Sequence, residues 1–257
     1  MTNPVRQSFN RAAGSYAASA ALQQLVRDQL LRQATQGLTA DYVGTLLDAG
    51  CGTGELLQQL RADLPCATII GVDFAEDMLR QQLMTPGLSW VNADLQQLPI
   101  ADSHVDLYLS SLAWQWCDIA RAVSEAKRIL RPGGHLWLTT LVSGTFAELA
   151  VALDQIGLQP SRHLLSMPDA TQVLNHFEQA AMQVVHSQRD TVTTWHDDFA
   201  SLRRSIRGVG ANHLPTPARE PIDRSTRLAL VNAYNQQRTT HGLPLTYNVL
   251  TIHAQRP

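Results

Sequence analysis

The chain has 257 residues, of which 44% are hydrophobic and 16% charged, and these fractions exclude an intrinsically disordered protein. Its formal net charge of -2 argues against nucleic acid as the main partner. No stretch approaches the roughly 18 consecutive apolar residues of a membrane helix, and the first residues lack an apolar signal core. We therefore expect a cytoplasmic protein without a membrane partner.

Cysteine and histidine spacing gives no sign of a metal or a disulfide framework. Cys51, Cys66 and Cys117 are odd in number and unrelated in spacing. No pair of histidines has the spacing of metal ligands, so we expect no metal site.

Short apolar runs alternate with helical stretches between residues 45 and 141. Because these runs are continuously apolar, they are typical of parallel strands buried on both faces. The predicted strands are TLLDA (45–49), ATIIGVD (67–73), LSWVNA (88–93), VDLYLS (105–110) and HLWLTTL (135–141). The predicted helices between them are 54–64, 76–83 and 119–130, and Pro132-Gly133-Gly134 is expected to end the last one. This order predicts an α/β fold with a doubly wound sheet.

The pattern changes after residue 142, where two further strands are expected to complete a mostly parallel seven-stranded sheet. They lie at 181–195 and 243–255 and should be antiparallel neighbours at one edge. Helices at 197–208 and 224–238 form a cap inserted between them. The predicted single domain, 1–257, comprises an N-terminal helical cover (1–40), a core (41–195), the cap (196–240) and the last strand (241–257).

A glycine-rich turn follows the first predicted strand, with Gly50, Gly52 and Gly54 in five residues. Glycine allows positive φ angles and close approach of the backbone to a ligand, and ligands of open α/β sheets bind beyond the carboxyl ends of the strands. A dinucleotide site requires a third small residue where this chain has Glu55, and that carboxylate would repel a pyrophosphate. With Asp48 on the other side of the turn, the pattern favours a ligand that carries positive charge.

The segment DAGCGTGE (48–55), with Asp73 ending the second strand, resembles class I S-adenosylmethionine (SAM) dependent methyltransferases. ADLQQLP (93–99), VDLYLSSLAWQW (105–116) and LRPGGHLWLTT (130–140) follow in the order of that family. The resemblance implies a Rossmann-like fold and SAM as cofactor, with S-adenosylhomocysteine as product.

The resemblance also implies residues for the methionine end of SAM. The three glycines of the turn would lie against it, and Asp48 would order the turn and sense the ammonium group. Ser110, which ends the fourth strand, would place its carbonyl near that ammonium.

The nucleoside end is assigned in the same way. Asp73 would accept hydrogen bonds from the ribose hydroxyls, and Phe74 and Met78 would pack on the adenine. Asp94 and the Leu95 amide would bind the edge of the adenine. Met78 as ordinary helix core and Asp94 as a turn cap are the structural alternatives.

Four segments outside these motifs resemble the malonyl-acyl-carrier-protein O-methyltransferases of biotin synthesis. They are FNRAAGSYAASAALQQ (9–24), SSLAWQWC (110–117), FASLRRSIRGVGANHL (199–214) and PLTYNVLTIHAQR (244–256). This resemblance implies methylation of the free carboxylate of a malonyl thioester, with the acyl carrier protein as partner.

A carboxylate acceptor is ionised at neutral pH, so we expect no general base. Tyr16, Gln115 and Trp116 are candidate hydrogen-bond donors to the carboxylate. Trp114 and Trp116 lie two apart after the fourth strand, and we expect one to be buried and the other to line the pocket.

Arginines on the cap supply a second anion-binding candidate. Arg203 and Arg207 are spaced to share one helix face, and His213 is a further candidate donor. The residues leave open which arginine meets the malonyl carboxylate and which meets the carrier protein, and whether a coenzyme A thioester is also accepted.

Three alternatives remain to be separated. The first is a carboxyl methyltransferase for a small free di- or tricarboxylic acid, of the aconitate type. The others are a non-catalytic protein of the same fold, disfavoured by the intact glycine turn and Asp73, and a nicotinamide dehydrogenase, disfavoured by Glu55.

Overall fold

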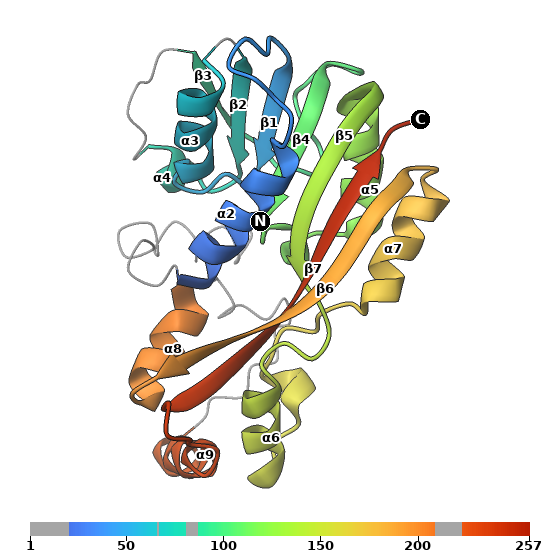
Figure 1. Ribbon diagram of the computed structural model, residues 1–257. Coiled ribbons are helices and arrows are strands. Elements are labelled where there is room, and N and C mark those ends of the chain that lie inside the picture. Colours follow the sequence, from blue (N-terminus) through green and yellow to red (C-terminus); the bar gives the residue numbers. More distant parts are fainter. Residues whose placement is uncertain (1–20, 66, 81–86, 209–222) are drawn as a thin grey trace.

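A twisted seven-stranded sheet runs through the molecule (Figure 1). The computed structural model describes residues 21–65, 67–80, 87–208 and 223–257. The strands are β1 (Thr45–Ala49), β2 (Thr68–Asp73), β3 (Leu88–Asn92), β4 (Val105–Ser111), β5 (Leu130–Leu141), β6 (Gln183–His196) and β7 (Leu243–Gln255). Their order is β3-β2-β1-β4-β5-β7-β6, and β7 is antiparallel to both of its neighbours. The predicted doubly wound sheet, with an antiparallel pair at one edge, is confirmed.

Helices cover both faces of the sheet and form a group at one end. They are α2 (Ala21–Ala34), α3 (Glu55–Asp63), α4 (Glu76–Leu79), α5 (Ile119–Ile129), α6 (Ala147–Gln155), α7 (Ala170–Gln179), α8 (Phe199–Gly208) and α9 (Arg224–Asn235), with the 3-10 turns η2 (Trp114–Trp116) and η3 (Pro160–Arg162). Apolar residues of α5 and α7 form one buried cluster with the strands, and those of α2 and α3 form another on the opposite face. Helices α6 and α7 were not predicted.

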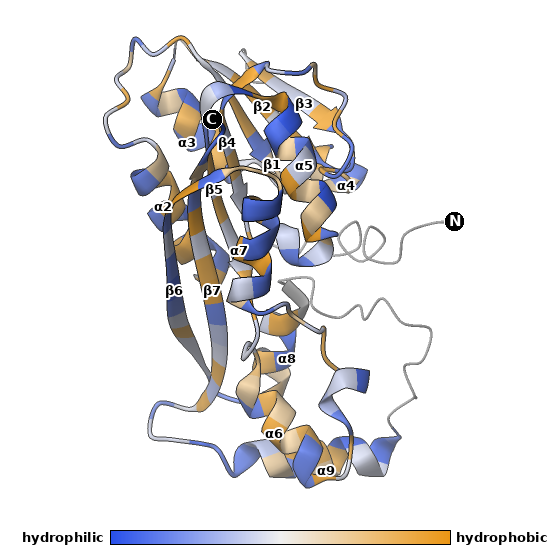
Figure 2. Ribbon diagram, turned by 90° about the vertical axis from the view of Figure 1, so that its right-hand side faces the viewer, coloured by the Kyte–Doolittle hydropathy of each residue, from blue (hydrophilic) through white to orange (hydrophobic). Residues whose placement is uncertain are grey.

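The last two strands continue beyond the rest of the sheet as a two-stranded ribbon. β7 pairs with β5 only over Val249–Gln255 but with β6 along its whole length. Figures 1 and 2 show α6, α8 and α9 gathered around the free end of this ribbon. A third buried apolar cluster, to which Leu202, Tyr234 and Leu245 belong, joins these helices to β7. The predicted cap is therefore present, inserted between β6 and β7.

Helix α2 spans the cap and the sheet. Leu22 and Val26, in its first half, belong to the cap cluster. Leu31 and Ala34, in its second half, pack with α3 and the strands. The helical cover predicted for the N-terminal region thus connects the two parts of the molecule through its described portion.

One predicted turn is wrong in its detail. Helix α5 ends at Ile129, and its C-cap residue Leu130 is already extended and pairs with Val105. The Pro-Gly-Gly segment follows inside β5, where the register with β4 shifts before the pair Leu107 and His135. Gly133 has a φ of 79°, so this glycine accommodates the irregularity in the strand and does not terminate the helix.

Within these ranges of the chain, no helix is long and apolar enough to cross a membrane.

Candidate functional site

A cavity opens at the carboxyl ends of β1, β2, β3 and β4. Parallel strands of an α/β sheet commonly place a ligand at this edge. The cavity is lined by Gly50, Gly52, Val72, Asp73, Phe74, Met78, Ala93, Asp94, Leu95, Gln96, Ser111, Leu112, Ala113, Trp116 and Cys117. Two carboxylates lie among these residues, and lysine, arginine and histidine are absent from this lining set.

The glycine-rich turn has the backbone conformation predicted for it. Gly50, Gly52 and Gly54 have φ angles of 80°, 54° and 74°, a region that side chains with a Cβ rarely adopt. The amide of Gly50 donates to the Val72 carbonyl at 2.7 Å, which holds the turn against the end of β2. A Cβ atom at Gly50 would lie 2.4 Å from the Cβ of Ala113. The turn therefore has no room for a larger residue at this position.

Asp73 links the end of β2 to the glycine turn. Its Oδ2 accepts a hydrogen bond from the Gly52 amide at 2.9 Å, and its Oδ1 accepts one from the Ala75 amide at 2.8 Å. The side chain is buried but lines the cavity. Burial raises the pKa of Asp73, and the amides of Ala75 and Gly52 oppose that rise. Because a carboxylate oxygen can accept more than one hydrogen bond, the geometry leaves acceptor capacity for a ligand.

Asp48 lies beneath the turn and outside the set of residues that line the cavity. Its side chain is almost fully buried, and burial raises its pKa to about 7, with the nearby charge of Asp73 adding to the rise. The positive charge of Arg27 acts in the opposite direction. Asp48 is thus an acid whose ionisation is sensitive to any additional positive charge nearby.

Glu55 forms an ion pair with a residue that lies far from the glycine turn in the sequence. Arg27, on α2, donates to its Oε2 at 2.8 Å, and the Thr53 hydroxyl donates to its Oε1 at 3.0 Å. This pairing offsets part of the negative charge of Glu55, so the repulsion expected for a pyrophosphate is weaker than the sequence suggested. The glycine spacing carries the distinction instead, because Gly50, Gly52 and Gly54 do not match the Gly-x-Gly-x-x-Gly pattern of a dinucleotide site.

The residues predicted for the adenine lie together in the cavity. Phe74, Met78, Asp94 and Leu95 all line it, although Met78 is only 1% exposed. Asp94 is exposed, and its Oδ1 accepts a hydrogen bond from the Gln96 amide at 2.9 Å. Asp94 therefore caps the turn, which is the structural alternative, and it also lies in the cavity wall.

Two predicted site residues have structural partners and lie outside the cavity lining. Ser110 is fully buried, and its hydroxyl donates to the Ala49 carbonyl at 2.6 Å. The side-chain amide of Gln115 donates to the Leu112 carbonyl at 2.6 Å, and its oxygen accepts from Thr140 at 3.4 Å. These contacts join β1 to β4 and hold the segment after β4, and the predicted binding roles of both residues stay predictions.

The two tryptophans divide as expected. Trp114 is fully buried, stacked on Phe177 at a centroid distance of 5.9 Å and edge-on to Tyr108 at 6.1 Å. Trp116 is half-buried and lines the cavity. The 3-10 turn η2 separates them because residues two apart in such a turn point in different directions.

The structure places the remaining predicted substrate residues only in part. Arg203 lies on α8 with an exposed side chain. Arg207 lies one turn later on the same helix, but its side chain is outside the described residues, as are Tyr16 and His213. Their roles stay predictions.

Several cavity residues were not predicted from the sequence. Ser111, Leu112, Ala113, Gln96 and Cys117 contribute backbone and volume to the wall. Leu112 has a positive φ of 51°, and its amide donates to the Thr139 carbonyl at 2.9 Å, which turns the chain over the sheet. The available signal was their position directly after the fourth strand and beside the adenine motif.

Across the described ranges, no group of three or more histidine, cysteine, aspartate or glutamate side chains is arranged to hold a metal ion.

Known proteins resemble this chain over almost its whole length. A family model described as a methyltransferase domain matches residues 47–138. A malonyl-[acyl-carrier protein] O-methyltransferase from Dechloromonas aromatica is 38% identical over 98% of this chain and 94% of its own. The biotin biosynthesis bifunctional protein BioHC from Cellvibrio japonicus is 32% identical over 98% of this chain and 50% of its own.

Solved structures show the same fold at low sequence identity. A putative methyltransferase from Bacillus halodurans superposes with a TM-score of 0.63 and 16% identity over 90% of this chain and 98% of that chain. The geranyl diphosphate C-methyltransferase of Streptomyces coelicolor, solved in complex with S-adenosyl-L-homocysteine, has a TM-score of 0.52 and 14% identity over 93% of this chain and 76% of that chain.

The relationship to the Dechloromonas enzyme spans almost the whole chain. The methyltransferase domain match includes the glycine turn and the acid at the end of β2. The chain belongs to the malonyl-[acyl-carrier protein] O-methyltransferase family.

Proposed function

We propose that the protein transfers a methyl group from SAM to the free carboxylate of a malonyl thioester carried on acyl carrier protein. The product is the methyl ester that primes pimeloyl synthesis for biotin. The observation that carries this proposal is 38% identity with the Dechloromonas enzyme over 98% of the chain, which includes the cap as well as the cofactor domain.

The described cavity fits SAM. Gly50 and Gly52 line the cavity with positive φ angles, and a Cβ at Gly50 would overlap Ala113 in the cavity wall. Asp73 is buried, lines the cavity and retains acceptor capacity. The lining carries acids and no basic side chain, which suits a cofactor with ammonium and sulfonium charges and no phosphate. When bound, SAM supplies an electrophilic methyl group.

The proposed chemistry requires placement more than proton transfer. A malonyl carboxylate is ionised at pH 7, so the enzyme's residues need not remove a proton from it. Opposite charges about 4 Å apart at an effective dielectric of 20 attract by roughly 4 kcal/mol. That attraction weakens as the charges cancel in the transition state, so it does not by itself accelerate transfer. Holding the carboxylate close, in line and away from water supplies the acceleration.

Trp116 and Arg203 are the residues of the described chain that we assign to the acceptor. Trp116 lines the cavity next to the segment that follows β4, where it can exclude water and donate a hydrogen bond. Arg203, on α8, supplies positive charge on the cap, and we assign Arg207, Tyr16 and His213 to the same acceptor on the basis of the family resemblance. A malonyl carboxylate, a phosphopantetheine phosphate and an acidic carrier protein are all anions that arginine binds well.

The decisive test is the mass of the carrier protein after reaction. Incubation with SAM and malonyl-acyl carrier protein should add the mass of one methyl group to the malonyl-loaded carrier and leave the unloaded carrier unchanged. Alkaline treatment, which hydrolyses the thioester, should release the added mass together with the malonyl group. An unchanged malonyl carrier, with methylation of another acceptor, would refute the proposal.

The small-acid alternative predicts a different ranking of substrates. A free-acid enzyme would turn over di- or tricarboxylates faster than the malonyl thioester. The comparisons do not favour it, because the relatives that match almost the whole chain are named for malonyl-acyl carrier protein.

A further inference from the structure

The loop between β3 and β4 forms one wall of the cavity and is tied to helix α5. Asp94, Leu95 and Gln96 line the cavity near the start of this loop. The side chain of Gln96 accepts a hydrogen bond from the amide of Asp118, the residue that caps α5, at 3.0 Å. Deeper in the loop, Leu98 is buried against the cluster that contains α5.

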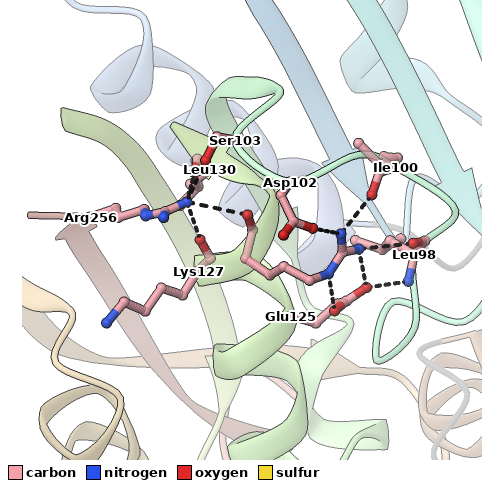
Figure 3. Close-up of polar contacts among 9 residues, drawn as sticks. Leu98, Ile100, Asp102, Ser103, Glu125, Lys127, Leu130 and Arg256 are labelled. Atoms are coloured by element: carbon pink, nitrogen blue, oxygen red, sulfur yellow. Dashed lines mark hydrogen bonds and ion pairs between the residues drawn. The ribbon is translucent and has the colours of Figure 1, made fainter. Parts of the chain in front are cut away.

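Glu125 and Arg128, on α5, bind both polar groups of the Leu98 backbone (Figure 3). The Leu98 amide donates to Oε1 of Glu125 at 2.6 Å, and the Leu98 carbonyl accepts from Arg128 at 3.0 Å. Arg128 also donates to the carbonyl of Ile100 at 2.8 Å and to the carboxylate of Asp102 at 2.6 Å. The ion pair of Glu125 with Arg128 thus fixes the loop at Leu98, Ile100 and Asp102.

The two charged residues also hold each other rigidly. Two nitrogens of Arg128 donate to the two carboxylate oxygens of Glu125, at 2.9 Å and 2.7 Å. The side chain of Glu125 is only 13% exposed, and its hydrogen bond with Arg128 lowers its pKa. A bidentate pair of this kind is preorganised, so the loop is held in one position before a ligand arrives.

We infer that Glu125 and Arg128 are positioning residues that set the affinity for the nucleoside part of SAM by fixing the wall formed by Asp94, Leu95 and Gln96. Neither residue lines the cavity, so the effect passes through Leu98. Without the ion pair, Leu98 is released and the wall can take other arrangements. SAM must then order the wall when it binds, which lowers its apparent affinity. The inference rests on the proposed use of SAM.

A second arginine, which follows β7 and contacts the C-terminal end of α5, offers a matched control. Arg256 donates to the Ser103 hydroxyl at 3.0 Å and to the carbonyls of Lys127 and Arg128 at 3.0 Å and 3.2 Å. A further contact joins it to the Leu130 carbonyl (Figure 3). These bonds join the far end of the β3–β4 loop, at Ser103, to the junction of α5 and β5, but none of them reaches Leu98. Arg256→Ala should therefore lower stability and leave the adenine wall in place.

The experiment measures SAM binding and turnover for Glu125→Ala, Arg128→Ala and Arg256→Ala. We expect the Kd for SAM to rise about tenfold in the first two variants. A rise of this size corresponds to a wall that is correctly placed in about one-tenth of the molecules. The value of kcat at saturating SAM and the KM for the malonyl carrier should stay within about twofold. 5′-Methylthioadenosine, which lacks the amino-acid end, should lose affinity by the same factor. Glu125→Gln keeps an oxygen acceptor for the Leu98 amide and should recover part of the affinity.

Two outcomes would overturn the inference. One is an unchanged Kd for SAM in Glu125→Ala. The other is a similar rise in Kd in Arg256→Ala at an equal loss of thermal stability, which would mean that general destabilisation is the cause. Failure of the unsubstituted protein to bind SAM would count against the proposed function and is seen separately, before any variant is compared.

Discussion

At the scale of single residues, the site depends on acids whose charge is costly to bury. Asp48 is almost fully buried, and its pKa is raised to about 7, far above that of a carboxyl group in an unfolded chain. Between about pH 4 and pH 7 the folded protein therefore binds more protons at this site than the unfolded chain does. The free energy of unfolding therefore falls as the pH rises through this window. Above pH 7 the ionised carboxylate of Asp48 destabilises the folded protein by its full amount.

Replacing Asp48 with Asn should remove this cost. We expect Asp48→Asn without SAM to be more stable than the original protein at pH 8, by about 4 kcal/mol, and by only about 1 kcal/mol at pH 4.5. The affinity for SAM should fall at pH 8, because a charge that favours the cofactor's cation is lost. Urea unfolding at both pH values and calorimetric titration with SAM would measure these effects. An equal gain at both pH values would show that ionisation of Asp48 is not the cause.

Gly50 illustrates a second residue-scale constraint, and Gly133 provides its control. Both have φ near 80°, but a Cβ at Gly50 would meet Ala113 at 2.4 Å, while a Cβ at Gly133 would meet no atom within 4 Å. Gly133→Ala should cost about 1 kcal/mol, from backbone strain alone. Gly50→Ala should cost about 2–4 kcal/mol and abolish SAM binding, since strain and overlap add. Comparable losses in chemical denaturation would argue against a steric role for Ala113.

The residues that could be predicted from the sequence are those whose type is dictated by backbone geometry or charge. Gly50, Gly52 and Asp73 belong to this group. Ser111 and Leu112 could not be found, because their contribution to the cavity comes from where the chain turns and not from side-chain chemistry. The ion pair of Arg27 with Glu55 was missed for another reason: residues far apart in sequence meet there through packing of α2.

At the scale of elements, the predicted bounds agree best with the structure where the sequence pattern is strongest. β1 and β7 were predicted at their observed bounds: β1 lies between Gly44 and Gly50, and β7 begins directly after Gly242. Helix α7 was missed although Asp169 and Gln172 form a capping box at its start, a signal present in the sequence. Helix α6 begins after Phe146 in the left-handed region without a side-chain cap. Its start is fixed by tertiary packing, which local propensity does not reveal.

At the scale of the whole molecule, the cap and the sheet share elements and so should unfold together. β7 contributes Leu245 to the cap cluster and Ile252 to the sheet cluster, and α2 spans both regions in the same way. Such continuity opposes independent unfolding of either part.

This sharing predicts a single transition even when the cap is weakened. Leu202, on α8, is fully buried in the cap cluster, and Leu202→Ala should cost about 2–4 kcal/mol. Leu228, on α9, is 61% exposed, and Leu228→Ala should change stability by less than about 0.5 kcal/mol. Differential scanning calorimetry should show one peak, shifted downward only by the first variant. Two separate peaks would mean that the cap and the sheet are independent units.

The order of strands in the sheet also governs how the chain can assemble during synthesis. Among the described strands, β6 lies at the edge and pairs with β7 alone, and β7 follows it in the chain by way of α8 and α9. A growing chain that has reached β6 therefore exposes an unpaired strand, while β5 still presents an open edge. Both edges are closed by one late event, the insertion of β7 between them, so a nascent chain stalled before Leu243 is a candidate for aggregation or chaperone capture.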